Sequence, residues 1–342
     1  MRKSGGNVTI KSIADALGIS FSTVSKALNG DPNISAQTRQ LVEEKAQEMH
    51  YTRNYFAQSL RQKGSKTVAI IVNDIDIPAY GEMVASISSS LAAYGYTTVV
   101  SDARYNEEFE RSSIQTVLSR MPEAVIIAPA DPLGANMQLF APIQSNTLVL
   151  GDVMGAENVN SLAVDHCLAG RISAEHMLNN GNRRNLIFCG PTGYQSSEYY
   201  LEGIRQVYEE HGLALEPELI QRFNPDLQTA YRRFLRAWQD SEQGFDGVIC
   251  FCDSIALGIY RAARELGLQV GQDISVIGYD DSITNEFTEP PLTTIHMPKD
   301  LVASHCSNFV INRLVSGDTR QYTYTLQPYL ADRGSVRKAG SK

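Results

Sequence analysis

The sequence has few cysteines and lacks long hydrophobic runs. No stretch of about 18 consecutive apolar residues occurs in the 342-residue chain, which argues against a transmembrane helix. Residues 1–18 contain too many polar side chains for a secretory signal peptide. The five cysteines are an odd number, and without an export signal we expect them to be reduced thiols. From these absences we expect a cytoplasmic protein that does not bind membranes.

Motifs for metals and nucleotide cofactors are also missing. Cys250 and Cys252 form a lone C-x-C with no further Cys or His at ligand spacing, so we expect two core thiols and no metal site. No G-x-G-x-x-G follows the first predicted strand, and no P-loop is present. We therefore expect neither a metal nor a cofactor.

Charge is distributed unevenly along the chain, whose net charge is −8. Residues 1–66 contain 10 Lys/Arg and 5 Asp/Glu, a net of +5, whereas residues 67–342 contain 20 and 33, a net of −13. A small basic segment followed by an acidic body is expected when one domain meets DNA phosphates and the rest does not.

The basic segment contains two short helical patterns separated by a break at residues 18–20. In the first, Ile10, Ile13, Ala14 and Leu17 recur at helical spacing. The second has a predicted buried side and a predicted polar side, the latter made by Ser22, Ser25, Lys26 and Asn29. Two helices joined by a three-residue turn with glycine are typical of a helix-turn-helix, although any αα-hairpin shows the same pattern. A third helix is expected after a cap at Ser35.

From Val68 onward, apolar strands alternate with helices. Buried strands are predicted at 68–72, 97–101, 124–128, 147–151, 186–189, 219–223, 247–251 and 274–278. Continuous apolar runs of this kind are typical of parallel βαβ units. Two successive α/β halves predict two lobes of doubly wound parallel sheet, with a ligand cleft at the carboxyl ends of the strands.

These motifs together resemble the LacI/GalR family of bacterial transcription regulators. In order, the resemblance is carried by VTIKSIADALGISFSTVSKALNG at 8–30, N-x-x-A-x-S-L at 54–60, IIVNDIDIPAY at 70–80, FCDSIALGIYRAARELGL at 251–268, DISVIGYDD at 273–281 and PPLTTI at 290–295. It implies an all-α helix-turn-helix head in residues 1–53, a hinge helix and linker in 54–66, and a two-lobed core in 67–342 similar to periplasmic sugar-binding proteins. The lobes would be about 67–165 with 296–325, and 166–293.

The resemblance also implies which residues of the head contact DNA. Base contacts fall on Phe21, Ser22 and Lys26. Lys26 suits guanine O6/N7 or a phosphate, and Phe21 suits a thymine methyl or packs onto its own helix. Phosphate contacts fall on Thr9, Ser20, Thr23, Ser25, Asn29 and Tyr51. For Thr9 and Ser20 helix capping is the alternative, and both roles can coexist.

The hinge motif implies minor-groove binding by Asn54, Ala57 and Leu60. In the family, paired hinge helices enter the minor groove and a leucine inserts into the central base step. Such an apolar wedge unstacks the step and bends the duplex. Arg53 stands where proline is frequent, which leaves the helix start less rigid but adds a charge that attracts phosphate.

Eight residues are implied as contacts of a small-molecule effector: Asp74, Tyr80, Asp102, Asp152, Tyr200, Cys252, Asp253 and Asp280. Because Tyr200 stands where an arginine commonly anchors the ligand, a neutral carbohydrate or glycoside is favoured over an anionic sugar. Asp165 and Asp253 directly precede predicted helices, so we expect both to act as caps. Asp280 stays open between ligand contact and structural role.

The combined prediction is a regulator that binds double-stranded operator DNA, and no enzyme. It would repress a carbohydrate-utilisation operon as a homodimer on a palindromic site, under control of a small carbohydrate. Alternatives are a core that answers to a protein partner or a non-sugar metabolite, a sugar-binding protein without regulatory role, and a glycosidase with paired cleft acids. The polar tail after Tyr329 has no apolar heptads, so we expect no tetramerising coiled coil.

Overall fold

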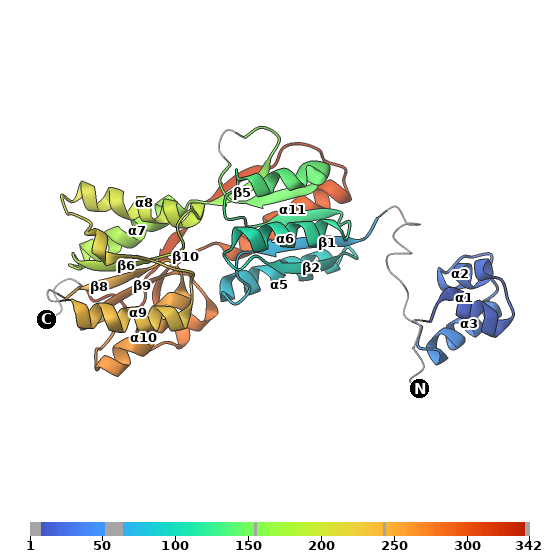
Figure 1. Ribbon diagram of the computed structural model, residues 1–342, viewed down its shortest axis with the longest axis horizontal. Coiled ribbons are helices and arrows are strands. Elements are labelled where there is room, and N and C mark those ends of the chain that lie inside the picture. The colour runs from blue at the N-terminus through green and yellow to red at the C-terminus, as the bar shows by residue number, and fades with distance from the viewer. Residues whose placement is uncertain (1–7, 52–63, 154–155, 242–243, 339–342) are drawn as a thin grey trace. The chain divides into compact units, whose positions relative to one another are not determined.

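The computed structural model describes residues 8–51, 64–153, 156–241 and 244–338 (Figure 1). It separates into two compact units, Met1–Ser65 and Lys66–Lys342. Among the described residues, no helix has both the length and the apolar character needed to cross a membrane.

The first unit is a three-helix head with α1 (Ile10–Leu17), α2 (Phe21–Leu28) and α3 (Ala36–Glu48). Each helix begins at a hydroxyl cap, because the side chains of Thr9, Ser20 and Ser35 accept from the backbone N–H three residues later. Gly18 ends α1 with a left-handed φ of 66°, which glycine adopts without strain, and turns the chain into α2. The helix-turn-helix prediction and the cap at Ser35 are confirmed.

The head closes on a small apolar core. Its buried members come from all three helices and are Ile13, Ala14, Val24, Ala27, Leu28, Val42 and Ala46. The apolar stripe of α1 therefore packs against the inner sides of α2 and α3, which leaves the opposite side of α2 exposed to solvent.

The first lobe of the second unit is a parallel sheet in the order β11-β5-β4-β3-β1-β2. Its strands are β1 (Thr67–Val72), β2 (Thr97–Asp102), β3 (Ala124–Ile127), β4 (Thr147–Leu150), β5 (Asn160–Val164) and β11 (Thr323–Leu326). Helices α5 (Pro78–Ala92) and α11 (Lys299–Leu314) contribute to the core on one face. Helix α6 (Glu107–Leu118) and the 3-10 helix η1 (Ala135–Asn146) contribute to the core on the other face.

The second lobe repeats this layout in the order β12-β10-β9-β8-β6-β7. Its strands are β6 (Asn185–Cys189), β7 (Ile220–Arg222), β8 (Gly247–Cys250), β9 (Ser275–Asp280), β10 (Thr293–His296) and β12 (Tyr329–Ala331). Helices α7 (His166–Asn179) and α8 (Gln195–Glu210) cover one face, and α9 (Leu227–Asp240) and α10 (Asp253–Leu266) the other (Figure 1). The short helices η2 (Pro217–Leu219) and η3 (Ile283–Phe287) complete it.

Two glycines bring α7 and α8 into backbone contact. A Cβ at Gly170 would lie 2.0 Å from the Tyr200 carbonyl oxygen, and one at Gly203 would lie 2.0 Å from that of Cys167. Only glycine fits at such distances, so these two positions set the spacing of the helices. The close packing fixes α8, whose amino-terminal end faces the other lobe.

The α/β fold class is confirmed, but the strand membership differs from the predicted lobe limits. Strand β10 pairs with β9, so the second lobe continues through His296, and the later first-lobe segment begins after it. After β11 the chain returns to the second lobe, where β12 pairs antiparallel with β10. The strands β5, β10, β11 and β12 were not predicted, because the first three carry polar residues and β12 has only three residues.

Candidate DNA-binding head and ligand cavity

The exposed side of α2 presents a small set of side chains suited to DNA. Phe21 is 46% exposed, and Ser22, Lys26 and Asn29 are also exposed. Thr23 is engaged at the helix start, where its N–H donates to the Ser20 hydroxyl at 3.0 Å. A helix end with hydroxyls and a nearby cation is the kind of surface that binds a phosphate backbone and reads base edges. The base-reading and phosphate roles stay predictions.

Ser25 departs from its predicted place. It was assigned to the polar side of α2, yet it is 7% exposed and lies on the buried side of the helix. Its neighbours Val24 and Leu28, one and three residues away, face the core, which turns Ser25 inward as well. The exposed position assigned to Ser25 is wrong, whereas its phosphate contact stays a prediction.

Three other residues that were predicted to contact DNA are part of the structure of the head. Thr9 caps α1, Ser20 caps α2, and Tyr51 is half-buried against the head core. Capping does not prevent Thr9 and Ser20 from meeting phosphates. The hinge candidates Asn54, Ala57 and Leu60 lie outside the described residues.

A cavity of about 110 Å³ lies between the two lobes of the second unit. Residues at or just after the carboxyl ends of β1, β4, β8 and β9 contribute to its lining, as expected for open parallel sheets. Its walls include the aromatic side chains Tyr80, Tyr105, Phe251 and Tyr279. Polar groups come from both lobes, with Asn73 in the first and His166, Gln195, Ser196, Cys252 and Asp280 in the second.

Neutral contacts join the lobes on one side of this cavity. The Gln195 side-chain amide accepts from the Asp152 N–H and donates to the Asp152 carbonyl, both at 2.9 Å. The rings of Tyr105 and Tyr194 lie 5.1 Å apart across the same boundary. The start of α8 is therefore tied to the loop after β4.

Asp280 ends β9 and enters the cavity with an uncommon backbone conformation. It is 8% exposed and has φ of 118°, and Asp281 follows with φ of 57°. Burial and the nearby Asp253 carboxylate raise the pKa of Asp280 well above its usual range, and the Lys299 ammonium offsets this in part. A side chain held in such a strained and desolvated position is typical of a ligand site.

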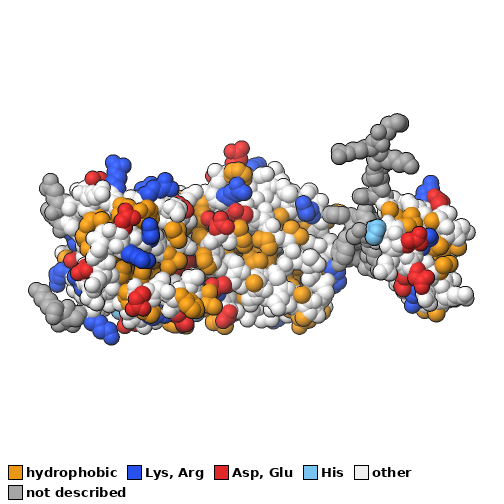
Figure 2. Space-filling view, turned by 90° about the horizontal axis from the view of Figure 1, so that it is seen from below, with side chains coloured by type: hydrophobic (Ala, Val, Ile, Leu, Met, Phe, Trp, Pro, Cys, Tyr) orange, Lys and Arg blue, Asp and Glu red, His pale blue; other side chains and the backbone are white. Residues whose placement is uncertain are grey.

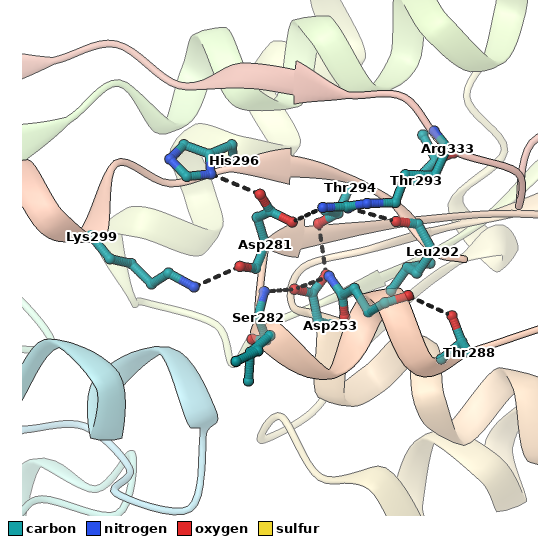
Figure 3. Close-up of polar contacts among 12 residues, drawn as sticks. Asp253, Asp281, Ser282, Thr288, Leu292, Thr293, Thr294, His296, Lys299 and Arg333 are labelled. Carbon is teal, nitrogen blue, oxygen red and sulfur yellow. Dashed lines mark hydrogen bonds and ion pairs between the residues drawn. The ribbon is translucent and has the colours of Figure 1, made fainter.

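Asp253 does not line the cavity, and its carboxylate faces Ser282 and Thr294 (Figure 3). Its carboxylate accepts from the Ser282 N–H and the Asn285 amide, each at 2.8 Å, and from the Thr294 hydroxyl at 2.7 Å. It is 1% exposed, and burial raises its pKa despite these donors. Its partners lie 29 to 41 residues away, so it joins distant segments.

Comparison with known proteins agrees with both units. The model of bacterial regulatory proteins, lacI family, matches residues 9–54, and that of the periplasmic binding protein-like domain matches residues 174–336. The chain belongs to the lacI family. The ribose operon repressor of Escherichia coli (strain K12) is 27% identical over 334 residues, which are 96% of this chain and 99% of that protein.

Two further comparisons extend over nearly the whole chain. The HTH-type transcriptional repressor PurR of Pasteurella multocida is 26% identical over 333 residues, covering 96% of this chain and 98% of that protein. The crystal structure of the Lac repressor dimer bound to operator and the anti-inducer ONPF aligns with a TM-score of 0.76 and 26% identity. That alignment covers 97% of this chain and 100% of the other.

In this lacI-family chain, three of the eight predicted effector residues line the cavity: Tyr80, Cys252 and Asp280. Tyr200 does not, because it is fully buried and its hydroxyl pairs with Ser173 at 2.8 Å and the Cys250 carbonyl at 3.3 Å. Asp253 also fails as an effector contact. Its expected capping role is wrong too, since Cys252 is the N-cap residue and Asp253 begins the helix.

The remaining acids lie outside the lining. Asp74 accepts from the Asp76 N–H and Asp102 from the Arg104 N–H, so each carboxylate closes a tight turn after its strand. Asp152 meets Gln195 through its backbone. The capping role expected for Asp165 is confirmed, because its carboxylate accepts from the Leu168 N–H at 2.8 Å.

Several lining residues were missed by sequence reasoning. Asn73 and Phe251 directly follow or end predicted strands, so the rule that ligands bind at carboxyl strand ends could have identified them. His166 begins α7 shortly after the unpredicted β5, and burial lowers its pKa to about 4, which keeps it neutral near pH 7. Its ring nitrogen Nδ1 lies 2.8 Å from the Tyr279 hydroxyl.

The two adjacent buried carboxylates predict opposite effects on stability. Asp253→Asn should lower the free energy of unfolding by roughly 1–3 kcal/mol, because a carboxamide cannot accept from all three donors. Asp280→Asn should leave stability unchanged or raised, because it removes a desolvated charge beside Asp253. Urea unfolding at pH 7 measures both, and an equal loss in the two variants would contradict the assignment.

Proposed function

We propose that the chain is a cytoplasmic transcriptional repressor that binds a palindromic operator as a homodimer and responds to a small neutral ligand. The observation that carries the proposal is the presence, in one chain, of a lacI-family head and a cavity lined by two lobes. Relatives named as repressors over nearly the full length support it.

Base reading is assigned to Phe21, Ser22 and Lys26 on the exposed side of α2. Phosphate contacts are assigned to the surrounding donors Thr9, Ser20, Thr23, Ser25, Asn29 and Tyr51. One head with so few base contacts binds weakly, so two heads on a two-fold-symmetric site are needed for specificity. We also propose that the hinge residues Asn54, Ala57 and Leu60 enter the minor groove, with Leu60 as the wedge.

The ligand is proposed to be a neutral carbohydrate or glycoside. Lysine and arginine do not occur among the described residues that line the cavity, so an anionic ligand would lack a counter-charge there. The Asn73 side-chain oxygen is buried and has no hydrogen-bond partner among the described residues, and Asp280 offers further acceptor atoms. Acceptors facing aromatic walls suit a ring that carries hydroxyl donors.

Control of DNA binding requires that the ligand prefer one arrangement of the lobes. The cavity takes its walls from both lobes, so a ligand that contacts both is bound more tightly when they are closed. The ligand shifts the equilibrium only by this difference in affinity.

The dimer is proposed to use apolar side chains of the second unit. Apolar groups reach the surface of this unit between charged ones (Figure 2). Two of the most exposed are in η3, where Ile283 is 70% exposed and Phe287 is 84% exposed. Large exposed apolar side chains close together are typical of protein interfaces. A second copy of the chain is the partner that a palindromic operator demands.

The first prediction concerns DNA. The purified protein should select a palindromic sequence from a randomised duplex library, and Lys26→Ala should relax the preference at one position in each half-site. Lys11→Ala, which removes an exposed cation from α1, is the matched control and should retain the preference. An unaltered base preference in Lys26→Ala would show that Lys26 contacts phosphate only.

The second prediction concerns the dimer. Phe287→Glu should shift the protein from dimer to monomer at micromolar concentration, because it places a charge in an apolar contact. Met121→Glu, at a side chain that is 57% exposed in the first lobe, should remain dimeric. Sedimentation velocity measures the change, and a dimeric Phe287→Glu protein would exclude η3 from the interface.

The third prediction concerns the ligand. In a thermal-shift screen, at least one neutral mono- or disaccharide should raise the melting temperature of the wild-type protein by mass action. The same sugar should produce no shift with Asp280→Asn, which keeps the shape of the side chain but loses an acceptor. A shift of equal size in both proteins would remove Asp280 from the binding site.

A further inference from the structure

Lys299 occupies the junction of the two lobes beside the cavity. It is the first residue of α11, close to the point where the chain leaves β10 for the first lobe. Its Nζ lies 2.6 Å from Glu82 Oε2 and donates to the Asp281 carbonyl at 2.6 Å. Glu82 belongs to α5 of the first lobe, whereas Asp281 follows β9 of the second. Figure 3 shows the Lys299 side chain extended toward Asp281.

Glu82 makes a second connection between the lobes. Its Oε1 accepts from the Ile283 N–H at 3.4 Å, so one carboxylate reaches the second lobe directly and also through Lys299. The Lys299 side chain is 11% exposed and that of Glu82 is 34% exposed. A pair this sheltered from solvent is screened less by salt than a surface pair.

The turn that receives these contacts is the one that places Asp280 in the cavity. Asp280 and Asp281 both have positive φ, a conformation that non-glycine residues keep only when their surroundings impose it. The Asp281 carboxylate supplies part of that restraint, since it pairs with His296 Nδ1 at 2.8 Å and with Arg333 Nη2 at 2.7 Å. Lys299 holds the carbonyl of the same residue.

We propose that Glu82 and Lys299 form a latch between the lobes, and that Lys299 is a positioning residue for the cavity carboxylate Asp280. Separation of the lobes breaks the contacts from Lys299 to Asp281 and from Glu82 to Ile283, which frees the strained turn. The orientation of Asp280 and the closure of the lobes are thereby one coupled change. The function of the latch rests on the proposed control of the core by a ligand. The contacts that form it belong to the unliganded protein.

If the Glu82–Lys299 ion pair served only the first lobe, a different result would be expected. Lys299 and Glu82 lie on α11 and α5, which pack together in the first lobe, so their ion pair could serve that lobe alone. Loss of such a pair would loosen α5 and α11 and leave the turn of the second lobe unchanged. The amides of Ser282 and Ile283 therefore report on the latch, because both belong to the second lobe.

The test is hydrogen–deuterium exchange by mass spectrometry on the full-length protein without ligand or DNA. In Glu82→Gln and in Lys299→Met, exchange in the segment 281–287 should be faster by roughly tenfold or more, the effect of losing a hydrogen bond to a charged group. The double variant should exchange no faster than the single variants, because both remove the same latch. Glu82→Gln preserves the size of a partly exposed side chain, so it keeps the test decisive if Lys299→Met does not fold.

The matched control is Glu210→Gln, which breaks the 2.8 Å ion pair with Arg171 between α7 and α8, inside the second lobe. It should leave exchange in 281–287 unchanged. Unaltered exchange in Glu82→Gln, or single effects that add in the double variant, would overturn the latch. Either result would leave the ligand screen and the operator selection unaffected, so failure here is distinct from failure of the proposed function.

Discussion

The second lobe depends on the buried carboxylate of Asp253. It sits at the start of α10 and accepts hydrogen bonds from the turn after β9, from η3 and from β10. No side chain can come between it and β9, because a Cβ at Gly278 would lie 2.1 Å from Asp253 Oδ1. One charge thus joins the start of α10 to three contacts that lie 29 to 41 residues further along the chain. An apolar residue there would leave three buried donors without partners.

The buried Asp253 carboxylate also affects the ionisation of Asp280 in the cavity. Asp280 comes to lie near Asp253, so two carboxylates share a desolvated region, and burial together with the Asp253 charge raises the pKa of Asp280. The lobe tolerates the two carboxylates because Asp253 accepts hydrogen bonds and because the Lys299 ammonium lies close to Asp280. A ligand can therefore give the Asp280 carboxyl group better hydrogen-bond partners than the unliganded protein does. This difference is the condition for a ligand to stabilise one state.

The sequence predicted the repeated α/β plan because most central strands are continuous apolar runs. It did not predict β5 or β10, whose buried residues include Asn160 and Thr294. Asn160 tolerates burial because its amide donates to the Thr147 carbonyl and its oxygen accepts from the Tyr322 N–H. Such partners are brought together only by the tertiary fold, so no local pattern indicates them.

The site was predicted unevenly for the same reason. Tyr80 and Asp280 were implied by the family resemblance, and both line the cavity. Asp280 ends β9, at the sheet edge where open parallel sheets bind ligands, whereas Tyr80 lies in α5. Tyr200 was misplaced because its burial depends on the contact of α7 with α8 at Gly170 and Gly203. Asp253 was expected to cap a helix because it directly precedes the predicted helical pattern, which is a local feature, whereas its actual partners are distant in sequence.

Two of the connections between the lobes differ in chemistry, and this difference affects how a ligand can act. The neutral Gln195 side chain pairs with the backbone of Asp152. The charged side chains of Glu82 and Lys299 instead reach the backbone of Ile283 and Asp281 in the second lobe. A ligand that moves a population from 1:99 to 99:1 must favour one state by about 5.5 kcal/mol. If contacts between the lobes favoured the closed state by a larger free energy than this, a ligand could not change the populations of the two states. Because the Glu82 side chain is 34% exposed, water can replace the contacts that it and Lys299 make with the second lobe. The charged latch can therefore define the geometry of the closed state without fixing its population.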